Sequence, residues 1–107
     1  MAEQLHSETF DAYIQSSTQP VLVDFFRDGC LPCRRIAPLV SKAETEYAGK
    51  LAFARVNITT NPDLAAKQEV EAAPTLVLYR NGAEIARHRG AIKKEELTSL
   101  IEAHLQI

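Results

Sequence analysis

The segment VLVDFF, residues 21–26, constrains the fold of this chain more than any other. It is apolar at both even and odd positions, apart from Asp24. A strand with one face in water alternates between apolar and polar residues, whereas a strand covered on both faces is apolar throughout. Residues 21–26 are therefore predicted to form a strand in the middle of a sheet. Asp24 is the exception that needs a reason.

The next two segments predict a helix and a second strand. Between residues 31 and 47, apolar side chains share one helical stripe: Ile36, Leu39, Val40, Ala43 and Tyr47. Pro38 inside this helix predicts a kink, because proline removes a backbone donor and clashes with the preceding turn. Gly49 ends the helix, and residues 51–58 alternate like a strand. Strand, helix and strand in this order predict a parallel pair joined by a right-handed crossover.

Capping and turn residues predict the remaining elements. Ser7 is a candidate N-cap for a first helix, and Asn61 followed by proline is another for a short helix through about Glu69. Strands at 75–79 and 83–88 flank the sequence Asn-Gly, the strongest short-range signal of a hairpin. A last helix runs from about Lys93, with one face formed by Leu97, Leu100, Ile101, His104 and Leu105.

Length and charge exclude several classes of function. A chain of 107 residues is predicted to be a single domain, residues 1–107. Its net charge of −2 provides no field that attracts nucleic acid or anionic lipid. The N-terminus shows no signal-peptide pattern, and no apolar run approaches the roughly 18 residues that span a bilayer. We expect a cytoplasmic monomer that binds neither nucleic acid nor membrane.

Cys30 and Cys33 are the candidate chemical groups. In a reducing compartment, a close cysteine pair is more often catalytic or metal-binding than a structural staple. Cys30 is expected at or just before the first helical position, where unpaired amides and the positive end of the helix dipole favour a thiolate. Cys33, one turn on, is within disulfide reach and is expected to be more shielded from water. We expect Cys30 to attack and Cys33 to resolve.

Other roles for the cysteine pair are weighed by ligand count. Two cysteines cannot complete a tetrahedral zinc site, and His6, His88 and His104 do not stand at ligand spacing from them. An iron–sulfur cluster shared between two chains is an open alternative, since each chain would supply two thiolates. Inert packing is a second one. His104 is expected to be partly buried, while His88 and His6 are expected to lie in solvent.

The order and spacing of several motifs resemble the thioredoxin family over essentially the whole chain. These motifs are the VLVDF strand, Cys30-x-Pro32-Cys33 with Pro38 five residues on, residues 55–58 (RVNI), Ala73-Pro74-Thr75, Asn81-Gly82 and Gly90-Ala91. The resemblance implies an α/β thioredoxin fold, in which a central mixed sheet is flanked by about four helices on both faces.

The resemblance also implies roles for particular residues. Asp24 corresponds to the buried acid beneath the second cysteine, which accepts a proton from Cys33. A carboxyl group in an apolar strand should have a raised pKa through desolvation; the alternative is a strand-end aspartate satisfied by backbone amides. Pro74 corresponds to the family's cis-proline, which pairs with the substrate backbone. The implied substrate-binding residues are Gly29, Leu31, Pro32, Ile58, Ala73, Pro74, Arg89 and Gly90.

The chain departs from the family around the first cysteine and in its charges. The family usually has tryptophan before this cysteine and glycine after it, whereas here Gly29 and Leu31 flank Cys30 and the chain has no tryptophan. Arg55 stands where lysine is common, and its permanent charge would hold Asp24 ionised without shuttling a proton. Arg89 replaces an apolar residue of the docking surface. With the arginines at 27, 34 and 35 it predicts a basic rim and a preference for acidic or otherwise distinct partners. The alternative is that these arginines are ordinary solvated surface residues.

These observations predict a thiol-disulfide oxidoreductase that reduces protein disulfides through Cys30 and Cys33. No cofactor is needed beyond this redox-active pair, and the resemblance implies a flavin-dependent thioredoxin reductase as electron donor. Two alternatives remain at this stage. One is a binding module or partner subunit with incidental thiols, and the other is a more oxidising, isomerase-like member of the family.

Overall fold

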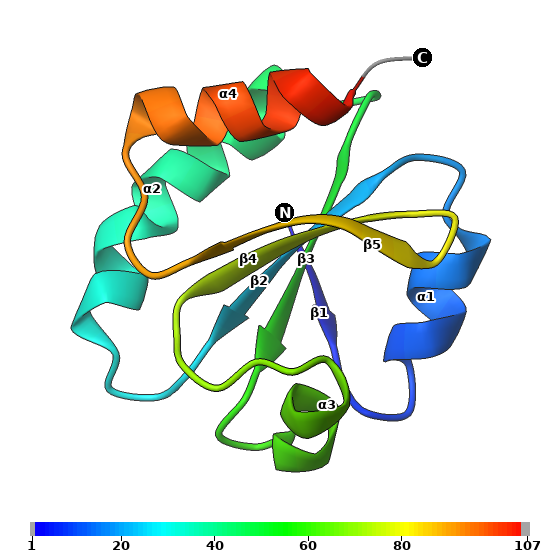
Figure 1. Cartoon of the computed structure of the whole chain (residues 1–107), viewed down its shortest axis with the longest axis vertical. Helices are drawn as coiled ribbons and strands as arrows, with labels where there is room; N and C mark the ends of the chain where they lie inside the picture. The colour runs from blue at the N-terminus through cyan, green and yellow to red at the C-terminus, as the bar shows by residue number, and fades with distance from the viewer. Residues whose placement is uncertain (1, 106–107) are drawn as a thin grey trace.

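The computed structural model describes residues 2–105. Five strands and four helices follow one another along these residues, as Figure 1 shows: β1 (Glu3–Leu5), α1 (Phe10–Ser16), β2 (Val21–Phe26), α2 (Leu31–Glu46), β3 (Ala52–Asn57), α3 (Pro62–Lys67), β4 (Thr75–Arg80), β5 (Ala83–Arg89) and α4 (Lys94–His104).

The strands form one mixed sheet in the order β1-β3-β2-β4-β5. Strands β1, β3 and β2 are parallel, and β4 and β5 are antiparallel to their neighbours. The apolar strand β2 therefore lies in the centre, as predicted, and α2 connects it to its parallel neighbour β3. This is the fold class that the resemblance implies.

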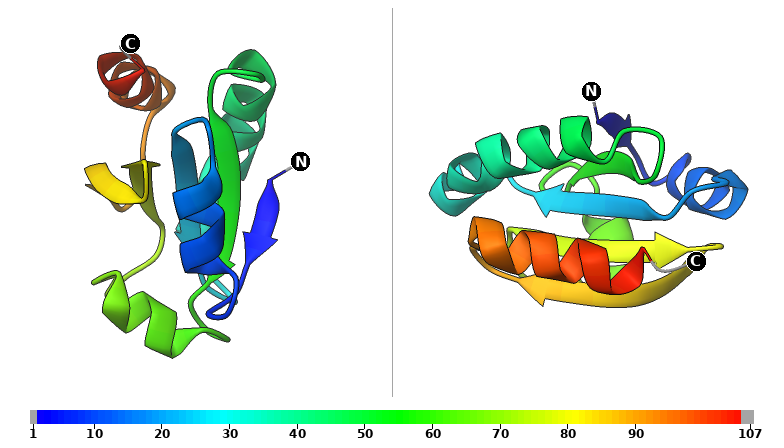
Figure 2. Two further views of the ribbon diagram at one scale, coloured as in Figure 1. Left: turned by 90° about the vertical axis from the view of Figure 1, so that its right-hand side faces the viewer. Right: turned by 90° about the horizontal axis from the view of Figure 1, so that it is seen from above.

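The sheet separates two apolar cores, and the helices cover both faces (Figure 2). On one face, Val21, Val23 and Phe25 of β2 pack with α1 and α3. On the other face, Leu22 lies in the core formed with α2 and α4. Because side chains alternate along a strand, Asp24 points to the same face as Leu22. The acid is thus directed at α2.

The structure corrects the prediction for the N-terminal segment. Strand β1 was not predicted, and α1 begins at Phe10 with Thr9 at the N-cap position. Ser7 is not an N-cap. Its hydroxyl donates to Asp63 at 2.8 Å and its backbone N–H donates to Asn61 Oδ1 at 3.0 Å. A strand of three residues with one buried side chain has too little pattern to be recognised from the sequence.

The short helix α3 begins as predicted but ends earlier. Asn61 occupies the N-cap position, yet its side chain makes no capping hydrogen bond because its oxygen accepts from Ser7. The helix ends at Lys67 and not near Glu69, since Glu69 has a left-handed φ of 57°. Helix α2 runs without interruption past Pro38.

The predicted hairpin between β4 and β5 is present. Asn81 and Gly82 have φ values of 54° and 81°, the combination required at the two central residues of a type I′ turn. A Cβ atom on Gly82 would lie 2.9 Å from Cγ of Gln15, so this glycine also allows close contact with α1. The strand pairing shifts by one residue near Leu78, so Tyr79 pairs with Glu84.

The histidines agree with the predictions in two cases out of three. His104 is partly buried and His6 is exposed, as expected. His88 is half-buried, contrary to the expectation of a solvated side chain. Its Nε2 atom lies 3.0 Å from the carbonyl oxygen of Ala91, because the chain turns back after β5.

Candidate functional site

One edge of the sheet gathers the residues that the sequence singled out. At this edge β2, β3 and β5 end and β4 begins, because β4 is antiparallel to β2 and β5. The N–H of Ile58 donates to the carbonyl of Phe26 at 2.8 Å, and the N–H of Gly90 donates to the carbonyl of Pro74 at 2.8 Å. Segments far apart in the sequence are thereby joined around the start of α2.

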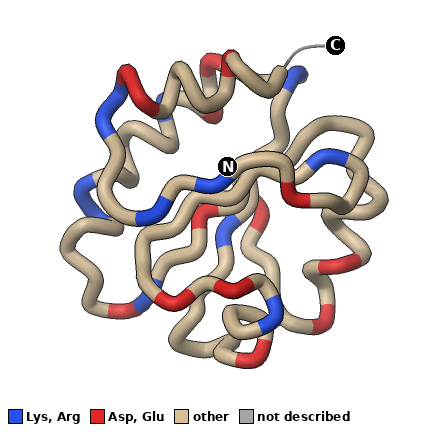
Figure 3. The backbone as a smooth tube through the Cα atoms, viewed as in Figure 1, with Lys and Arg blue, Asp and Glu red and all other residues tan. Residues whose placement is uncertain are grey.

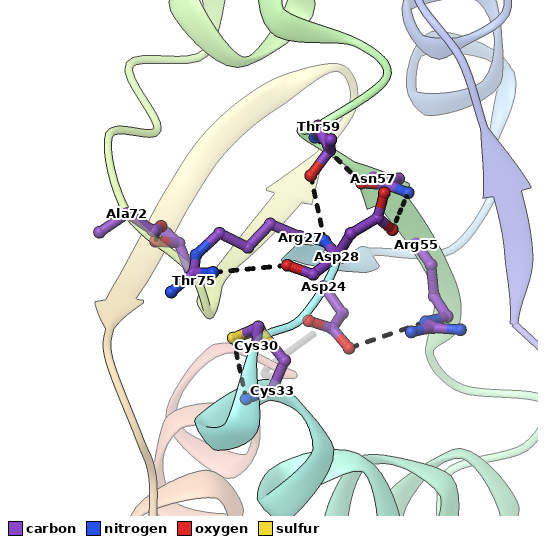
Figure 4. Close-up of a disulfide and its surroundings, with 10 residues drawn as sticks. All are labelled: Asp24, Arg27, Asp28, Cys30, Cys33, Arg55, Asn57, Thr59, Ala72 and Thr75. Carbon is purple, nitrogen blue, oxygen red and sulfur yellow. Dashed lines mark hydrogen bonds and ion pairs between the residues drawn. A yellow bond between two sulfur atoms is a disulfide. The ribbon is translucent and has the colours of Figure 1, made fainter.

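Cys30 and Cys33 form a disulfide at this edge (Figure 4). The Sγ atoms are 2.15 Å apart and the Cα atoms 5.2 Å apart. Cys30 is the N-cap of the 16-residue helix α2, and its Sγ atom accepts a hydrogen bond from the Cys33 N–H at 3.1 Å. The sulfur of Cys30 therefore occupies the electropositive start of a long helix, where an anion is stabilised.

The relative exposure of the two cysteines is opposite to the predicted order. Cys30 is 2% exposed and Cys33 is 8% exposed, whereas Cys33 was expected to be the more shielded residue. The physical reason is that Sγ of Cys30 turns inward to the first turn of α2, where it meets the Cys33 amide. In this oxidised form neither sulfur is freely exposed to solvent.

Asp24 faces the first turns of α2 from the central strand. Together with Ala37 and Val40 it lines an open cleft of about 870 Å³ on this side of the sheet. Ala37 is one turn beyond Cys33, so the carboxyl group and the second cysteine lie on the same side of α2. In the view of Figure 4 the carboxyl group lies between the disulfide and Arg55.

Burial sets the ionisation of Asp24. Desolvation raises the pKa of this carboxyl to about 6, and the positive charge of Arg55 opposes the shift. Its Oδ1 atom is buried and has no hydrogen-bond partner among the described residues. The alternative of an aspartate satisfied by backbone amides is therefore excluded for this oxygen, and the predicted direction of the pKa shift is confirmed.

Arg55 is the charged neighbour of Asp24 on the adjacent strand, in register with it. Its Nε atom lies 3.9 Å from Asp24 Oδ2, at the outer limit of an ion pair, and its side chain is 42% exposed. The guanidinium carbon lies 4.0 Å from the centre of the Phe26 ring. Stacking on this ring holds the cation beside the carboxyl without a direct hydrogen bond.

The peptide bond between Ala73 and Pro74 is cis, as predicted. Pro74 immediately precedes β4, and Thr75 is paired with Phe25 near the end of the central strand. The hydroxyl of Thr75 donates to the carbonyl of Ala72 at 2.7 Å, which closes the loop on itself. The cis-proline loop and the cysteine segment thus occupy the same edge of the sheet.

The surface around the disulfide combines an apolar group with basic ones. Leu31 is 48% exposed, and within residues 2–105 it is the one large apolar side chain that is exposed to solvent. The arginines at positions 27, 34, 35 and 89 are exposed. Figure 3 shows Lys and Arg along the side of the molecule where α2 and α4 begin. Gly29 has a left-handed φ of 66°, which turns the chain into Cys30.

A polar network behind this turn was not predicted. The N–H of Asp28 donates to Thr59 Oγ1, the Asn57 side chain donates to Asp28 Oδ1, and the Thr59 N–H donates to Asn57 Oδ1, each at 3.0 Å. These bonds fix the residues before Cys30 to the end of β3 (Figure 4). Ordinary loop residues about thirty positions apart carry no sequence signal of such contacts.

Two further findings concern metals and membranes. Within residues 2–105 no group of three or more His, Cys, Asp or Glu side chains is arranged to hold a metal ion. None of the helices in this range is both long enough and apolar enough to cross a membrane.

Comparison with known proteins agrees with the fold and with the family that the sequence resembles. The family model described as Thioredoxin matches residues 1–103. Thioredoxin 1 of Nostoc sp. is 36% identical over 97% of both chains, and the thioredoxin of Chlamydia pneumoniae is 39% identical over 97% of this chain and 99% of its own. The thioredoxin of Haemophilus influenzae is 35% identical over 98% of this chain and 100% of its own.

The chain belongs to the thioredoxin family. It is a thiol-disulfide oxidoreductase of the protein-disulfide reductase class, with Cys30 and Cys33 as its redox-active pair. This function is favoured over a binding module with incidental thiols. Two cysteines that served only for packing would not need to form a disulfide at the start of a helix.

Proposed function

We propose that the Cys30 thiolate attacks a disulfide of a client protein. A bond forms between Sγ of Cys30 and one client sulfur, and the other client sulfur leaves as a thiolate. The Cys33 thiolate then attacks Sγ of Cys30. This step forms the intramolecular disulfide and releases, as a thiolate, the client sulfur that was bonded to Cys30. Two electrons pass to the client, and an external donor returns them to the disulfide.

The observation that carries this proposal is the position of Cys30 at the N-cap of α2. Its sulfur accepts the Cys33 amide hydrogen at 3.1 Å. In the reduced form the same amide and the helix dipole would stabilise negative charge on this sulfur, which makes it the nucleophile. Cys33 is then the resolving residue.

Asp24 is proposed to accept the proton of Cys33 during resolution. It faces the same side of α2, and a carboxyl with a pKa of about 6 is a better proton acceptor near neutral pH than an ordinary aspartate. The unpartnered Oδ1 atom leaves one oxygen available for the transferred proton.

The client is proposed to bind as an extended segment along the cis-proline loop, with its backbone paired to the Ala73–Pro74 region. The other proposed contacts surround this loop and the start of α2: Gly29, Leu31, Pro32, Ile58, Arg89 and Gly90. The exposed arginines would favour clients with acidic residues near their disulfide.

The remaining proposals concern the cellular setting. The protein would act as a cytoplasmic monomer that needs no bound cofactor, and a flavin-dependent thioredoxin reductase would supply its electrons. The support is the likeness to bacterial thioredoxins over nearly the whole chain. This electron donor would be a separate protein and not a part of this chain.

The decisive experiment is insulin reduction with dithiothreitol as reductant, followed by titration of the disulfide against glutathione. We expect turnover by the wild type and none above the uncatalysed rate by Cys30→Ser. When reduced Cys33→Ser is mixed with insulin after dithiothreitol has been removed, we expect a stable mixed disulfide because the resolving thiol is missing. Absence of turnover in the wild type would refute the proposal. A reduction potential near that of protein disulfide isomerase, about −180 mV, would favour the isomerase-like alternative.

A further inference from the structure

The segment 68–74 connects α3 to β4 and carries the cis-proline. Strand β5 fixes its far end, because the N–H of Gly90 donates to the Pro74 carbonyl and Arg89 is paired with Thr75. The near end of the segment lies beside the middle of β5. A side chain of this strand makes the contact there.

That side chain is Arg87. Its Nη1 atom donates to the carbonyl of Glu69 at 2.8 Å and its Nη2 atom donates to the carbonyl of Gln68 at 2.6 Å. Its Nε and Nη2 atoms also donate to the two carboxylate oxygens of Glu84, each at 2.8 Å. With a side chain only 11% exposed, Arg87 is held in a single orientation by partners on two sides.

The backbone at this point needs such a partner. Glu69 has a left-handed φ, and α3 ends with the N–H of Glu69 bonded to Ala66 and that of Val70 bonded to Ala65, at 3.1 and 2.8 Å. This is the Schellman arrangement, which directs the next carbonyls away from the helix. Arg87 satisfies these carbonyls from the neighbouring strand.

A second contact braces the same residue from β4. The hydroxyl of Tyr79, a residue only 2% exposed, donates to Oε1 of Gln68 at 2.7 Å. Both the backbone and the side chain of Gln68 are therefore attached to the hairpin. The start of the cis-proline segment is fixed to the sheet and not to α3 alone.

We infer that Arg87 is a positioning residue for client binding, which clamps the start of the cis-proline segment so that Ala73 and Pro74 present their backbone to the client in a fixed place. This inference rests on the proposed function. Glu84 orients the guanidinium through a bidentate pair, and Arg87 in turn lowers the pKa of Glu84 by hydrogen bonding to its carboxylate. The pair acts as one unit.

The test compares Arg87→Ala with Arg80→Ala as a matched control. Arg80 lies on the same hairpin and also donates to a main-chain carbonyl, that of His104, but at the opposite end of the sheet. For Arg87→Ala we expect the KM for insulin to rise about fivefold while kcat stays within about twofold, because a loosened loop weakens docking and leaves the sulfur chemistry intact.

Three further readouts separate positioning from general destabilisation. The rate constant for reduction of hydroxyethyl disulfide, which is too small to pair along the loop, and the reduction potential should both equal the wild-type values. Hydrogen exchange at the amides of Gln68, Glu69 and Val70 should become faster. The insulin KM of Arg87→Lys should lie between those of Arg87→Ala and the wild type, because an ammonium group cannot bridge two carbonyls and a carboxylate.

Equal insulin KM values for Arg87→Ala and Arg80→Ala would overturn the inference, and so would unchanged exchange at the three amides. The proposed function fails in a different way. A wild-type protein that reduces neither insulin nor hydroxyethyl disulfide would refute that function, while the exchange measurement would still decide whether Arg87 orders the segment.

Discussion

The buried carboxyl of Asp24 is expected to make the stability of the fold depend on pH. Its carboxyl is buried beside Arg55, and desolvation raises its pKa to about 6. A group whose pKa is higher in the folded state contributes stability that is complete below the unfolded pKa, and this stability is lost as the pH rises through the folded pKa. The free energy of unfolding should therefore decrease between about pH 4 and pH 7 because of Asp24 alone.

Asp24→Asn should remove this loss. Because one pKa unit corresponds to about 1.4 kcal/mol, we expect the oxidised variant to exceed the wild type in unfolding free energy by about 2 to 3 kcal/mol at pH 7, and by much less at pH 4. Urea unfolding at the two pH values measures the difference. An equal gain at both would show that the ionisation of Asp24 is not its cause.

The sequence predicted the residues of the candidate site but not the contacts that hold them in place. Cys30, Cys33 and Asp24 were recognisable because a cysteine pair at a helix start and an acid in an apolar strand are each unusual. Arg87 was not, because a strand arginine followed by a histidine has no distinguishing pattern, and the two carbonyls that it binds lie in a turn about twenty residues earlier. The exposure of the cysteines was also mispredicted, since it depends on the rotation of one side chain about a helix end.

At the scale of elements, the end of α3 holds backbone strain. Glu69 is a non-glycine residue with a φ of 57°. An L-residue in this conformation costs about 1 to 2 kcal/mol, and glycine avoids that cost but loses about 0.5 to 1 kcal/mol through its freedom in the unfolded chain.

Glu69→Gly should therefore raise the unfolding free energy by about 0.5 to 1 kcal/mol. Asn81→Gly is the matched control, because Asn81 has a similar φ of 54° but asparagine tolerates this region well. Urea unfolding of both variants gives the comparison. A gain as large for Asn81→Gly would contradict the assignment of strain to Glu69.

The elements themselves were predicted well where their pattern was long. The strands β2, β3, β4 and β5 and the helices α2 and α4 have enough residues for periodicity to be clear. Strand β1 and the start of α1 were missed or misplaced, because the three residues of β1 are defined by pairing with β3 and because Ser7 bonds to α3. Such long-range contacts override local capping preferences.

At the scale of the whole molecule, charge is distributed unevenly. The chain has a net charge of −2, yet exposed arginines at positions 27, 34, 35 and 89 lie around the edge that holds the disulfide. A local field of this kind changes association rates more than it changes bound-state affinity, and salt weakens it.

For a disulfide peptide with acidic flanks, kcat/KM should fall steeply as NaCl rises from about 20 mM to about 500 mM, because the Debye length shrinks over this range. A peptide of the same length with neutral flanks should change little. Arg34→Gln should flatten the dependence for the acidic peptide, whereas Lys50→Gln, which lies beyond the far end of α2, should not. Identical salt profiles for both peptides would exclude a role for the arginines in client choice.

The two edge strands, β1 and β5, disfavour pairing of this sheet with a strand of another molecule. Strand β1 has only three residues, and β5 carries Glu84, Arg87 and Arg89 along an irregularly paired stretch. Edge strands that are short or carry charged side chains disfavour pairing between the sheets of two molecules. We therefore expect that two molecules will not pair through these strands, which would leave the cis-proline loop as the place where an extended client finds backbone partners.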